Sequence, residues 1–441
     1  MSKPVVAIVG RPNVGKSTFF NKVVGRRISI EQDEPGVTRD RVYAEAQWLN
    51  RKFTLIDTGG LDPSSEDVLL SQMRQQTKLA IEMADVIIFM IDGKEGLTHT
   101  DNEIAQLLRQ AKKPVILVVN KIDTFDESRD VYDYYELGFR PIPISSVNSL
   151  NLGDLLDEVV ELFPAHTQEY RDENVISVAI VGRPNVGKSS LVNKLLGENR
   201  VIVSNIPGTT REAIDTELTL HGTTYRFIDT AGIRRKRAVV DQSIERYSVL
   251  RSFHAVDRSD IVILMVDASE GYTEQDKKII GYAHEAGKGI LVLVNKWDLI
   301  EKDNKTYRQW KEKFHQEFPF LKYAVVEMIS VLENSRVSKI IPMLDMINQN
   351  RARRIPTGRL NDLLHEIILM HSLPQDKGRS LKIYYATQSE TKPPTFVLFI
   401  NDESLMHFSY LRYLENRFRE AYDFTGTPIV FVLKEKTREQ A

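Results

Sequence analysis

The octapeptide Gly10-Arg11-Pro12-Asn13-Val14-Gly15-Lys16-Ser17 directly follows an apolar run and precedes a segment whose composition suits a helix. A strand that feeds a glycine-containing turn into a helix start leaves several backbone N–H groups unpaired, and the helix dipole favours negative charge there. In such a P-loop the lysine reaches the β- and γ-phosphates of a nucleotide and the serine hydroxyl binds Mg²⁺. The stretch therefore predicts a site for a nucleoside triphosphate.

The same eight letters occur a second time. Gly182-Arg183-Pro184-Asn185-Val186-Gly187-Lys188-Ser189 follows another apolar run, and the two lysines are 188 − 16 = 172 residues apart. Later motif residues keep this offset as far as Asp229, whereas Asp267 and Asn295 lie 175 residues after Asp92 and Asn120. The sequence thus predicts two copies of one domain, with three residues added between these two aspartates.

Composition limits the class of protein. The chain has 441 residues, of which 42% are hydrophobic and 27% charged, and its formal net charge is −2. About 150 residues per domain suggests about three domains, and the near-neutral charge does not favour a globally basic DNA-binding or membrane-surface protein. The absence of cysteine excludes disulfides and thiolate metal sites. With no room for a signal peptide before the first apolar run and no stretch long enough to span a bilayer, we expect a soluble, cytoplasmic protein.

Two further motifs are typical of Mg²⁺ and γ-phosphate sensing. A turn-rich stretch after the first P-loop contains Thr38, which is the candidate second Mg²⁺ ligand. An apolar run then delivers Asp57 to a strand end, where we expect it to hold Mg²⁺ through water; a flexible segment that suits contact with a γ-phosphate follows. That segment is Thr58-Gly59-Gly60, and the second copy has Thr210, Asp229 and Thr230-Ala231-Gly232 at the corresponding places.

The base is indicated by Asn120-Lys121-Ile122-Asp123, at the end of a strand expected over residues 115–119. A carboxylate accepts two hydrogen bonds from the N1–H and 2-amino groups of guanine, and adenine offers no such donor pair. GTP is therefore favoured over ATP. Ser145-Ser146 follows a short strand and is expected to supply backbone N–H groups to the guanine oxygen. The second copy has Asn295-Lys296-Trp297-Asp298 and Ser330-Val331.

Apolar strands alternate with segments of helical pattern in both copies. This order predicts an α/β class with doubly wound, mostly parallel sheets and a ligand at the carboxyl ends of the strands. We expect a first domain over residues 1–164, a polar linker over 165–174 and a second domain over 175–350. Residues 351–441 are patterned as helix, strand, strand, helix, strand, which predicts a compact α+β domain.

Together these motifs resemble the Der or EngA family of P-loop GTPases, which has two Era-like domains in one chain and a KH-like C-terminal domain. The matching stretches are GRPNVGKS, PGVTRD, DTGGL and NKID, then GRPNVGKS, PGTTRE, DTAGIRRK and NKWD. One departure is visible. Where the family usually has Ser-Ala-Leu and a glycine-containing turn, this chain has Ser330-Val331-Leu332-Glu333-Asn334, which puts the second guanine pocket in question although its backbone contacts can survive the change. The KH-like region contains no GxxG, which argues against sequence-specific reading of single strands.

The resemblance also bears on catalysis. Ras-like enzymes orient the attacking water with a glutamine just after the DxxG motif, but Leu61 and Ile233 stand there in this chain, so slow intrinsic hydrolysis is expected. Asn13 and Asn185 resemble a P-loop residue that in related GTPases helps to coordinate a K⁺ ion where an arginine finger would act. The predicted catalytic residues are these two asparagines with Lys16, Thr38, Lys188 and Thr210.

The partner implied by the resemblance is the assembling large ribosomal subunit with its RNA, bound by a monomer whose nucleotide states set the packing of its domains. Residues 351–441 contain 14 Lys or Arg and 11 Asp or Glu, a net charge of 14 − 11 = +3. Two alternatives stay open: a scaffold that hydrolyses GTP incidentally, and a nucleotide-dependent enzyme acting on a small molecule or a tRNA base. The candidate phosphate contacts are Arg351, Arg353, Arg354, Lys434, Lys436 and Arg438.

Overall fold

The computed structural model describes residues 3–25, 43–58, 66–124, 131–164, 175–198, 215–220, 222–229, 242–303, 305–376 and 378–435, with the backbone alone at 66–72, 198, 242–247 and 376. The chain forms two compact units, one of Met1–Tyr170 with Val240–Arg251 and one of Arg171–Val239 with Ser252–Ala441. Among the described residues, none of the helices is both long and apolar enough to cross a membrane.

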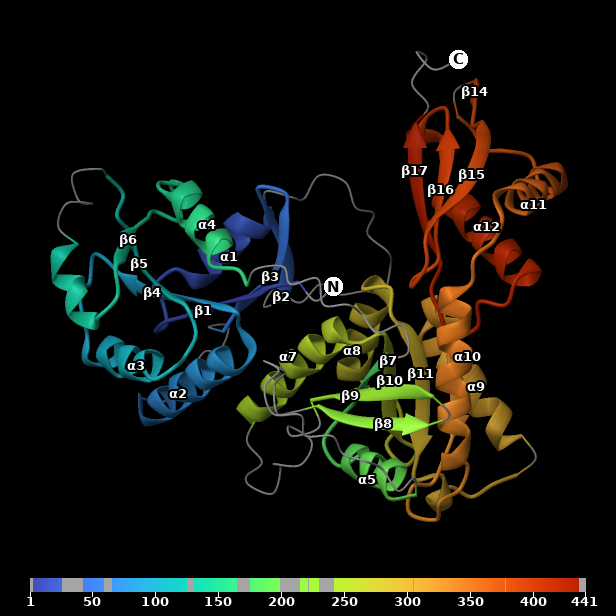
Figure 1. Ribbon diagram of the computed structural model, residues 1–441, viewed down its shortest axis with the longest axis horizontal. Coiled ribbons are helices and arrows are strands. Elements are labelled where there is room, and N and C mark those ends of the chain that lie inside the picture. Colours follow the sequence, from blue (N-terminus) through green and yellow to red (C-terminus); the bar gives the residue numbers. More distant parts are fainter. Residues whose placement is uncertain are drawn as a thin grey trace. The chain divides into compact units, whose positions relative to one another are not determined.

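The first domain is a six-stranded sheet in the order β2-β3-β1-β4-β5-β6, in which only the β2–β3 pair is antiparallel. Helices lie on both sides of this sheet (Figure 1). The doubly wound, mostly parallel arrangement predicted from the sequence is therefore confirmed. The elements are β1 (Val5–Val9), α1 (Lys16–Gly25), β2 (Tyr43–Trp48), β3 (Arg51–Asp57), α2 (Glu66–Met83), β4 (Val86–Asp92), α3 (His99–Arg109), β5 (Val115–Asn120), η2 (Tyr132–Leu137), β6 (Pro141–Pro143) and α4 (Leu152–Glu161).

Burial on both faces explains the continuous apolar runs of the central strands. All seven residues of β4 are buried. One set of alternate side chains, including Ile88, packs in a single cluster with Phe19 of α1 and Leu155 of α4. Helix α2 contacts β1 and α3. A strand covered on both faces has no polar side, so its sequence reads as an uninterrupted apolar run.

The second domain repeats this topology. Its sheet has the order β12-β11-β10-β7-β9-β8, which is the first order written backwards, again with one antiparallel pair. The predicted duplication of the fold is confirmed. The elements are β7 (Val175–Val181), α5 (Lys188–Glu198), β8 (Thr216–Leu220), β9 (Thr223–Ile228), α7 (Gln242–Arg258), β10 (Ile261–Asp267), α8 (Glu274–Glu285), β11 (Gly289–Asn295), η3 (Trp297–Leu299), α9 (Thr306–Glu317), η4 (Pro319–Leu321), β12 (Val325–Met328), η5 (Val337–Lys339) and α10 (Ile340–Ala352).

The C-terminal domain is a three-stranded sheet, β15-β16-β17, packed against two helices (Figure 1). The predicted order of helix, strand, strand, helix, strand is confirmed, and the structure adds a short β13–β14 ladder that the sequence pattern did not indicate. The elements are α11 (Thr357–Met370), β13 (Gln375–Asp376), β14 (Arg379–Ser380), β15 (Ile383–Glu390), β16 (Thr395–Ile400), η6 (Glu403–Leu405), α12 (Phe408–Ala421) and β17 (Val430–Glu435).

The C-terminal domain docks on the second domain through its own backbone. Ladder pairing between β11 and β12 begins at Leu291, so the preceding N–H of Ile290 lies beyond that pairing. This N–H donates to the carbonyl of Gly426 at 2.8 Å, and the N–H of Gly426 donates to the carbonyl of Tyr323 at 2.7 Å. The Arg419 guanidinium lies 4.6 Å from the centre of the Tyr323 ring. Gly426 therefore extends the β11 edge where β12 has not yet begun.

Arg351 lies in the contact between the C-terminal domain and the second domain, and it is not on an exposed surface. Its side chain is 3% exposed, lies 3.7 Å from the carboxylate of Asp260, and donates to the carbonyl of Gly287 at 3.5 Å. Its own carbonyl accepts from the N–H of Lys392 at 2.9 Å. The expectation that Arg351 contacts RNA phosphates is therefore wrong, because a buried guanidinium with an acidic neighbour is not available to a phosphate. Arg353 and Arg354 are exposed.

Replacing Arg351 with alanine tests this docking contact. We expect Arg351→Ala to destabilise the second unit by about 2 kcal/mol, because the half-buried carboxylate of Asp260 loses its cation and the carbonyl of Gly287 loses its donor. Hydrogen exchange at the amides of Ile290 and Gly426 should become faster. Arg354→Ala, which removes an exposed arginine three residues away, is the control and should leave both amides protected. Equal protection in the two variants would contradict the docking role.

Candidate nucleotide sites

Four loops of the first domain meet at the carboxyl edge of its sheet. The P-loop follows β1, Asp57 ends β3, Asp92 ends β4 and Asn120 ends β5. The parallel register places Ile8 beside Asp57 and Asp92 beside Asn120. Because the carboxyl ends of parallel strands share one edge, residues more than 100 positions apart in the sequence become neighbours. In the second domain, Asp267 lies beside Asn295 in the same way.

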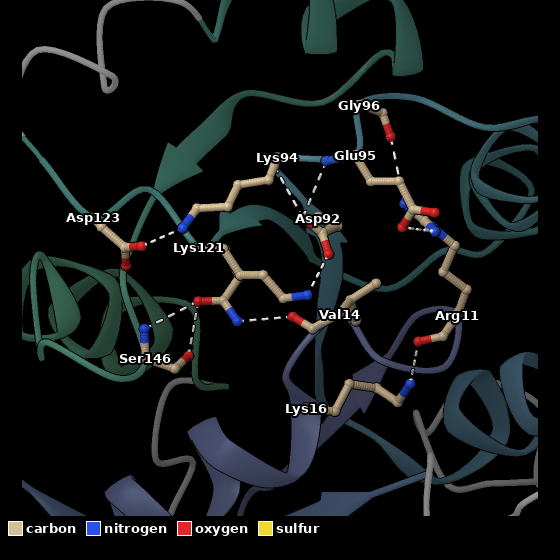
Figure 2. A network of polar contacts seen from close by, with 12 residues as sticks. Arg11, Val14, Lys16, Asp92, Lys94, Glu95, Gly96, Lys121, Asp123 and Ser146 are labelled. Carbon is tan, nitrogen blue, oxygen red and sulfur yellow. Dashed lines mark hydrogen bonds and ion pairs between the residues drawn. The ribbon is translucent and has the colours of Figure 1, made fainter.

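The carboxamide of Asn120 joins the P-loop to the loop that follows β6, through hydrogen bonds with Val14 and Ser146 (Figure 2). Its Nδ2 donates to the carbonyl of Val14 in the P-loop at 2.7 Å, and its Oδ1 accepts from the N–H of Ser146 at 3.0 Å and from the Ser146 hydroxyl at 2.9 Å. Asn295 repeats the arrangement, donating to Val186 at 2.8 Å and accepting from the N–H of Val331 at 3.0 Å. Each asparagine thus fixes the P-loop against the loop that follows β6 or β12.

This contact explains the second glycine of each octapeptide. Gly15 has a φ of 97°, and a Cβ added to it would lie 2.2 Å from Nδ2 of Asn120. Gly187 has a φ of 105°, and its Cβ would lie 2.3 Å from Nδ2 of Asn295. Both the left-handed backbone and the close approach exclude other residues. A protein side chain therefore occupies the space that a Cβ would need at each of these glycines.

The P-loop lysine is held by carbonyl groups of its own loop. The side chain of Lys16 is buried, and its Nζ donates to the carbonyls of Gly10 at 2.7 Å and Arg11 at 2.5 Å. Burial lowers the pKa of Lys16 to about 8, although the nearby carboxylate of Asp57 acts in the opposite direction. Lys188 donates to the carbonyls of Gly182 and Arg183 in the same way. The lysines therefore point into the curve of the loop, where a phosphate oxygen can replace a carbonyl.

Two of the predicted Mg²⁺ ligands lie together in the first site. The Ser17 hydroxyl donates to the Asp57 carboxylate at 2.7 Å, so the hard oxygen atoms that Mg²⁺ prefers are side by side. In the second site, the N–H of Asp229 donates to the Asp215 carboxylate at 3.0 Å, and Arg258 donates to that carboxylate at 2.6 Å. Within the described residues, no three His, Cys, Asp or Glu side chains group as a metal centre.

The predicted K⁺ ligands Asn13 and Asn185 have an unusual backbone conformation. Several other residues of the predicted sites lie outside the described parts of the chain. Asn13 and Asn185 are exposed and share a φ of 64°, a left-handed conformation that asparagine tolerates better than most residues. The residues outside the described ranges are Thr38, Gly59, Gly60, Thr210, Thr230, Ala231 and Gly232.

Asp123 is the carboxylate predicted to read the base, and we call the residues bonded to it the base-reading edge of the first site. Its carboxylate accepts from Nζ of Lys94 at 2.5 Å, from the hydroxyl of Ser145 at 2.8 Å and from the amide of Asn148 at 3.3 Å. The bond from Lys94, followed by that from Ser145, holds the pKa of Asp123 below its usual range. Lys121, which belongs to the same motif as Asp123, bonds to a different carboxylate: its Nζ lies 2.5 Å from Oδ2 of Asp92.

The loop around the second base-reading edge keeps the backbone geometry of the first despite its different sequence. Ser330 and Ser335 exchange backbone hydrogen bonds of 3.2 and 2.9 Å, as Ser145 and Leu150 exchange two of 3.2 Å. Together with the bond from Val331 to Asn295, this closes the loop in the same way. The departure at Leu332-Glu333-Asn334 therefore leaves these backbone contacts in place.

The loop amides assigned to the guanine oxygen already donate inside the protein. In the first domain, the N–H of Ser145 donates to the carbonyl of Leu150 and the N–H of Ser146 donates to Asn120. A guanine oxygen at this place has to share one of these N–H groups in a three-centre hydrogen bond. That these N–H groups supply the guanine oxygen stays a prediction, and the structure adds that they would be shared with partners inside the protein.

The arginine of each octapeptide points away from the P-loop and into a contact that sequence reasoning missed. Arg11 donates to the carboxylates of Glu95 at 2.6 Å and Asp101 at 3.2 Å. Asp101 is fully buried, and it completes a capping box with Thr98 at the start of α3. Burial raises the pKa of Asp101, although the bonds from Thr98 and the charge of Arg11 lower it. The arginine thus ties the P-loop to the next helix.

The second domain repeats this tie. Arg183 lies 2.7 Å from the carboxylate of Glu270 and 3.7 Å from that of Asp276, which caps α8 with Thr273. A signal for the contact exists in the sequence: both acidic positions recur at the offset of 175, since 270 − 95 = 175 and 276 − 101 = 175. The signal was missed because Asp101 and Asp276 resemble ordinary first-turn helix residues.

All three domains match known protein families. Residues 354–434 match the family described as "KH-domain-like of EngA bacterial GTPase enzymes, C-terminal", and residues 5–121 and 177–296 match "50S ribosome-binding GTPase". The GTPase Der of Alkaliphilus oremlandii is 56% identical over 438 residues, covering 99% of both chains. The GTPase Der of Acetivibrio thermocellus is 56% identical over 441 residues, covering 100% of both chains.

The chain belongs to the GTPase Der family. The resemblance noted from the motifs is thereby confirmed, and with it the two P-loop GTPase domains and the KH-like C-terminal domain. As a member of the Der family, the protein is an enzyme that hydrolyses GTP, which implies that it binds GTP and GDP.

The lowered pKa of Lys16 predicts a pH-dependent affinity at the first GTPase site. With the pKa of the empty site at about 8, a bound phosphate raises it, so binding takes up a proton above pH 8. We expect GDP affinity at this site to fall by about tenfold between pH 7 and pH 9. The measurement is titration of the full chain carrying Lys188→Ala, which removes the second site. A chain that also carries Lys16→Ala should bind GDP more weakly, with a flat profile over the same range.

Proposed function

We propose that each GTPase domain binds GTP with Mg²⁺ through the octapeptide and strand-end residues assigned above, and that the two sites act as a switch in assembly of the large ribosomal subunit. The observation that carries the proposal is the asparagine that joins two loops in each domain. It holds the P-loop and the base-reading loop in one fixed relation, at 2.7 and 3.0 Å in the first site and 2.8 and 3.0 Å in the second.

The proposed chemistry is positioning and charge neutralisation. Lys16 and Lys188 exchange their loop carbonyls for β- and γ-phosphate oxygens, and Ser17 and Ser189 bind Mg²⁺. Asp57 and Asp229 hold the ion from the strand ends, and Thr38 and Thr210 complete its ligands in the GTP-bound state. Asp123 and Asp298 accept the N1–H and 2-amino groups of guanine. Lys121 and Lys296, now bonded to Asp92 and Asp267 at 2.5 Å, lie beside the base.

A potassium ion is proposed to supply the positive charge that the sites lack. Leu61 and Ile233 stand where Ras-like enzymes have a water-orienting glutamine, and neither side chain forms hydrogen bonds. Asn13 and Asn185 are exposed on the rim of each P-loop, where a carboxamide oxygen is accessible to a cation. An ion next to the transferring phosphoryl group would stabilise its developing charge.

The potassium proposal predicts a cation-specific rate. Single-turnover GTP hydrolysis should be at least about tenfold faster in KCl than in NaCl at the same ionic strength, because Na⁺ is too small for the same ligands. Asn13→Ala with Asn185→Ala should remove the difference. Equal rates in the two salts for the unmodified chain would refute a K⁺ role and leave the Mg²⁺ sites unaffected.

The ribosomal role rests on family description and domain arrangement. The family model that matches both GTPase domains is described as a 50S ribosome-binding GTPase. The KH-like domain docks at the start of β11, the strand that ends at Asn295 in the second nucleotide site. We infer that nucleotide state alters the surface that these domains offer to ribosomal RNA, in a protein that acts as a cytoplasmic monomer. Exposed Arg353 and Arg354 remain candidates for phosphate contact.

Co-sedimentation with ribosomal subunits tests the switch. The chain should sediment with large subunits in a non-hydrolysable GTP analogue and remain in the supernatant with GDP, while small subunits serve as the control. Lys16→Ala and Lys188→Ala should each reduce the bound fraction by about tenfold or more, because each removes one nucleotide site. Sedimentation that is independent of nucleotide in all three chains would instead favour the scaffold alternative.

A further inference from the structure

The two base-reading edges differ at one position. Lys94 follows the end of β4, and its Nζ lies 2.5 Å from Oδ2 of Asp123 (Figure 2). The corresponding residue of the second domain is Ser269, since 269 − 94 = 175. Its hydroxyl and N–H both donate to Oδ1 of Asp267, at 2.6 and 2.9 Å, within its own turn. The cation that reaches the first carboxylate has no counterpart at this position of the second domain.

The two predicted base-reading carboxylates, Asp123 and Asp298, also differ in the hydrogen bonds that they accept. Asp123 accepts from Lys94 at one oxygen and from Ser145 and Asn148 at the other. Oδ1 of Asp298 is buried and has no hydrogen-bond partner among the described residues. The serines of the two loops are alike in one respect: Ser330 accepts from the N–H of Glu333 and Ser145 from the N–H of Asn148, both at 3.1 Å. A buried acceptor without a donor is costly and gains most when a ligand supplies one.

We propose that Lys94 makes the first site the weaker and less selective reader of guanine, and that Ser269 leaves the second site as the stronger one. The inference rests on the proposed guanine contacts of Asp123 and Asp298. A carboxylate already bonded to an ammonium group has part of its charge neutralised, so it accepts weaker hydrogen bonds from the N1–H and 2-amino groups. Guanine has to displace Lys94 or share the carboxylate with it.

The size of the effect follows from exposure. The side chain of Lys94 is 59% exposed and that of Asp123 is 34% exposed, so solvent screens their ion pair. Pairs of this kind are worth little, and the corresponding change in affinity is about two- to fivefold. Salt weakens such a pair further, so the difference between the sites should shrink as ionic strength rises. When guanosine nucleotide is scarce, the second site fills first.

The experiment compares GDP with inosine diphosphate, which lacks the 2-amino group. One site of the full chain is observed at a time, with Lys188→Ala disabling the second or Lys16→Ala disabling the first. Lys94→Ser should strengthen GDP binding at the first site by about two- to fivefold and increase its preference for GDP over inosine diphosphate. Ser269→Lys should change the second site in the opposite sense by a similar factor.

Two control variants distinguish the effect of the bond between Lys94 and Asp123 from the effect of removing any surface positive charge. Lys112→Ser removes an exposed lysine at the opposite end of β5, and it should leave both affinities unchanged. Lys94→Arg keeps a cation that can reach Asp123, and it should behave as the unmodified chain does. Unchanged affinity and selectivity in Lys94→Ser, or an equal gain from Lys112→Ser, would overturn the inference.

A last pair of variants distinguishes this failure from failure of the proposed function. Asp123→Ala and Asp298→Ala should each abolish the preference for GDP over inosine diphosphate at their own site. If they do so while Lys94→Ser changes nothing, the guanine contacts stand and the role of Lys94 is wrong. If the alanine variants keep the preference, the carboxylates do not read the base and both proposals fail.

Discussion

A neutral carboxamide at the end of β5, and another at the end of β11, holds each nucleotide site in shape. The group donates to one loop and accepts from another, which neither a carboxylate nor an ammonium group can do. Asn120 and Asn295 are 2% and 4% exposed, so these hydrogen bonds form away from water and pair both the nitrogen and the oxygen of each carboxamide. The P-loop is thereby fixed relative to the loop after β6 or β12 before any ligand arrives, and such preorganisation is what electrostatic catalysis needs.

Much of this arrangement follows from local sequence, because the signals are local. The strand expected over residues 115–119 is observed as β5, Val115–Asn120, since strand burial and strand length appear directly in the pattern. The octapeptides predict the P-loops because glycine and lysine act within a few residues. The glycine contact with Asn120 joins positions 15 and 120, and no local pattern predicts which side chain fills that space.

Residues with long-range partners were the ones misjudged. Arg351 looked like a surface cation in a charged, proline-containing stretch, yet its partners are Asp260 and Gly287 in another part of the fold. Arg11 belongs to the P-loop motif, but the motif does not indicate that its guanidinium binds Asp101, 90 residues away. The short β13–β14 ladder was missed because two-residue strands have no periodicity to detect. In each case the tertiary partner, and not the residue type, decides the role.

The docking of Gly426 beside β11 has a consequence for work on fragments of this chain. A piece that stops near residue 350 loses the acceptor of the Ile290 N–H, the donor to the Tyr323 carbonyl and the cation above the Tyr323 ring. Water then reaches the first residues of a strand whose last residue, Asn295, braces the second P-loop. Kinetic constants measured on such a fragment describe a sheet whose β11 edge lacks these contacts. They are not interchangeable with constants measured on the intact polypeptide.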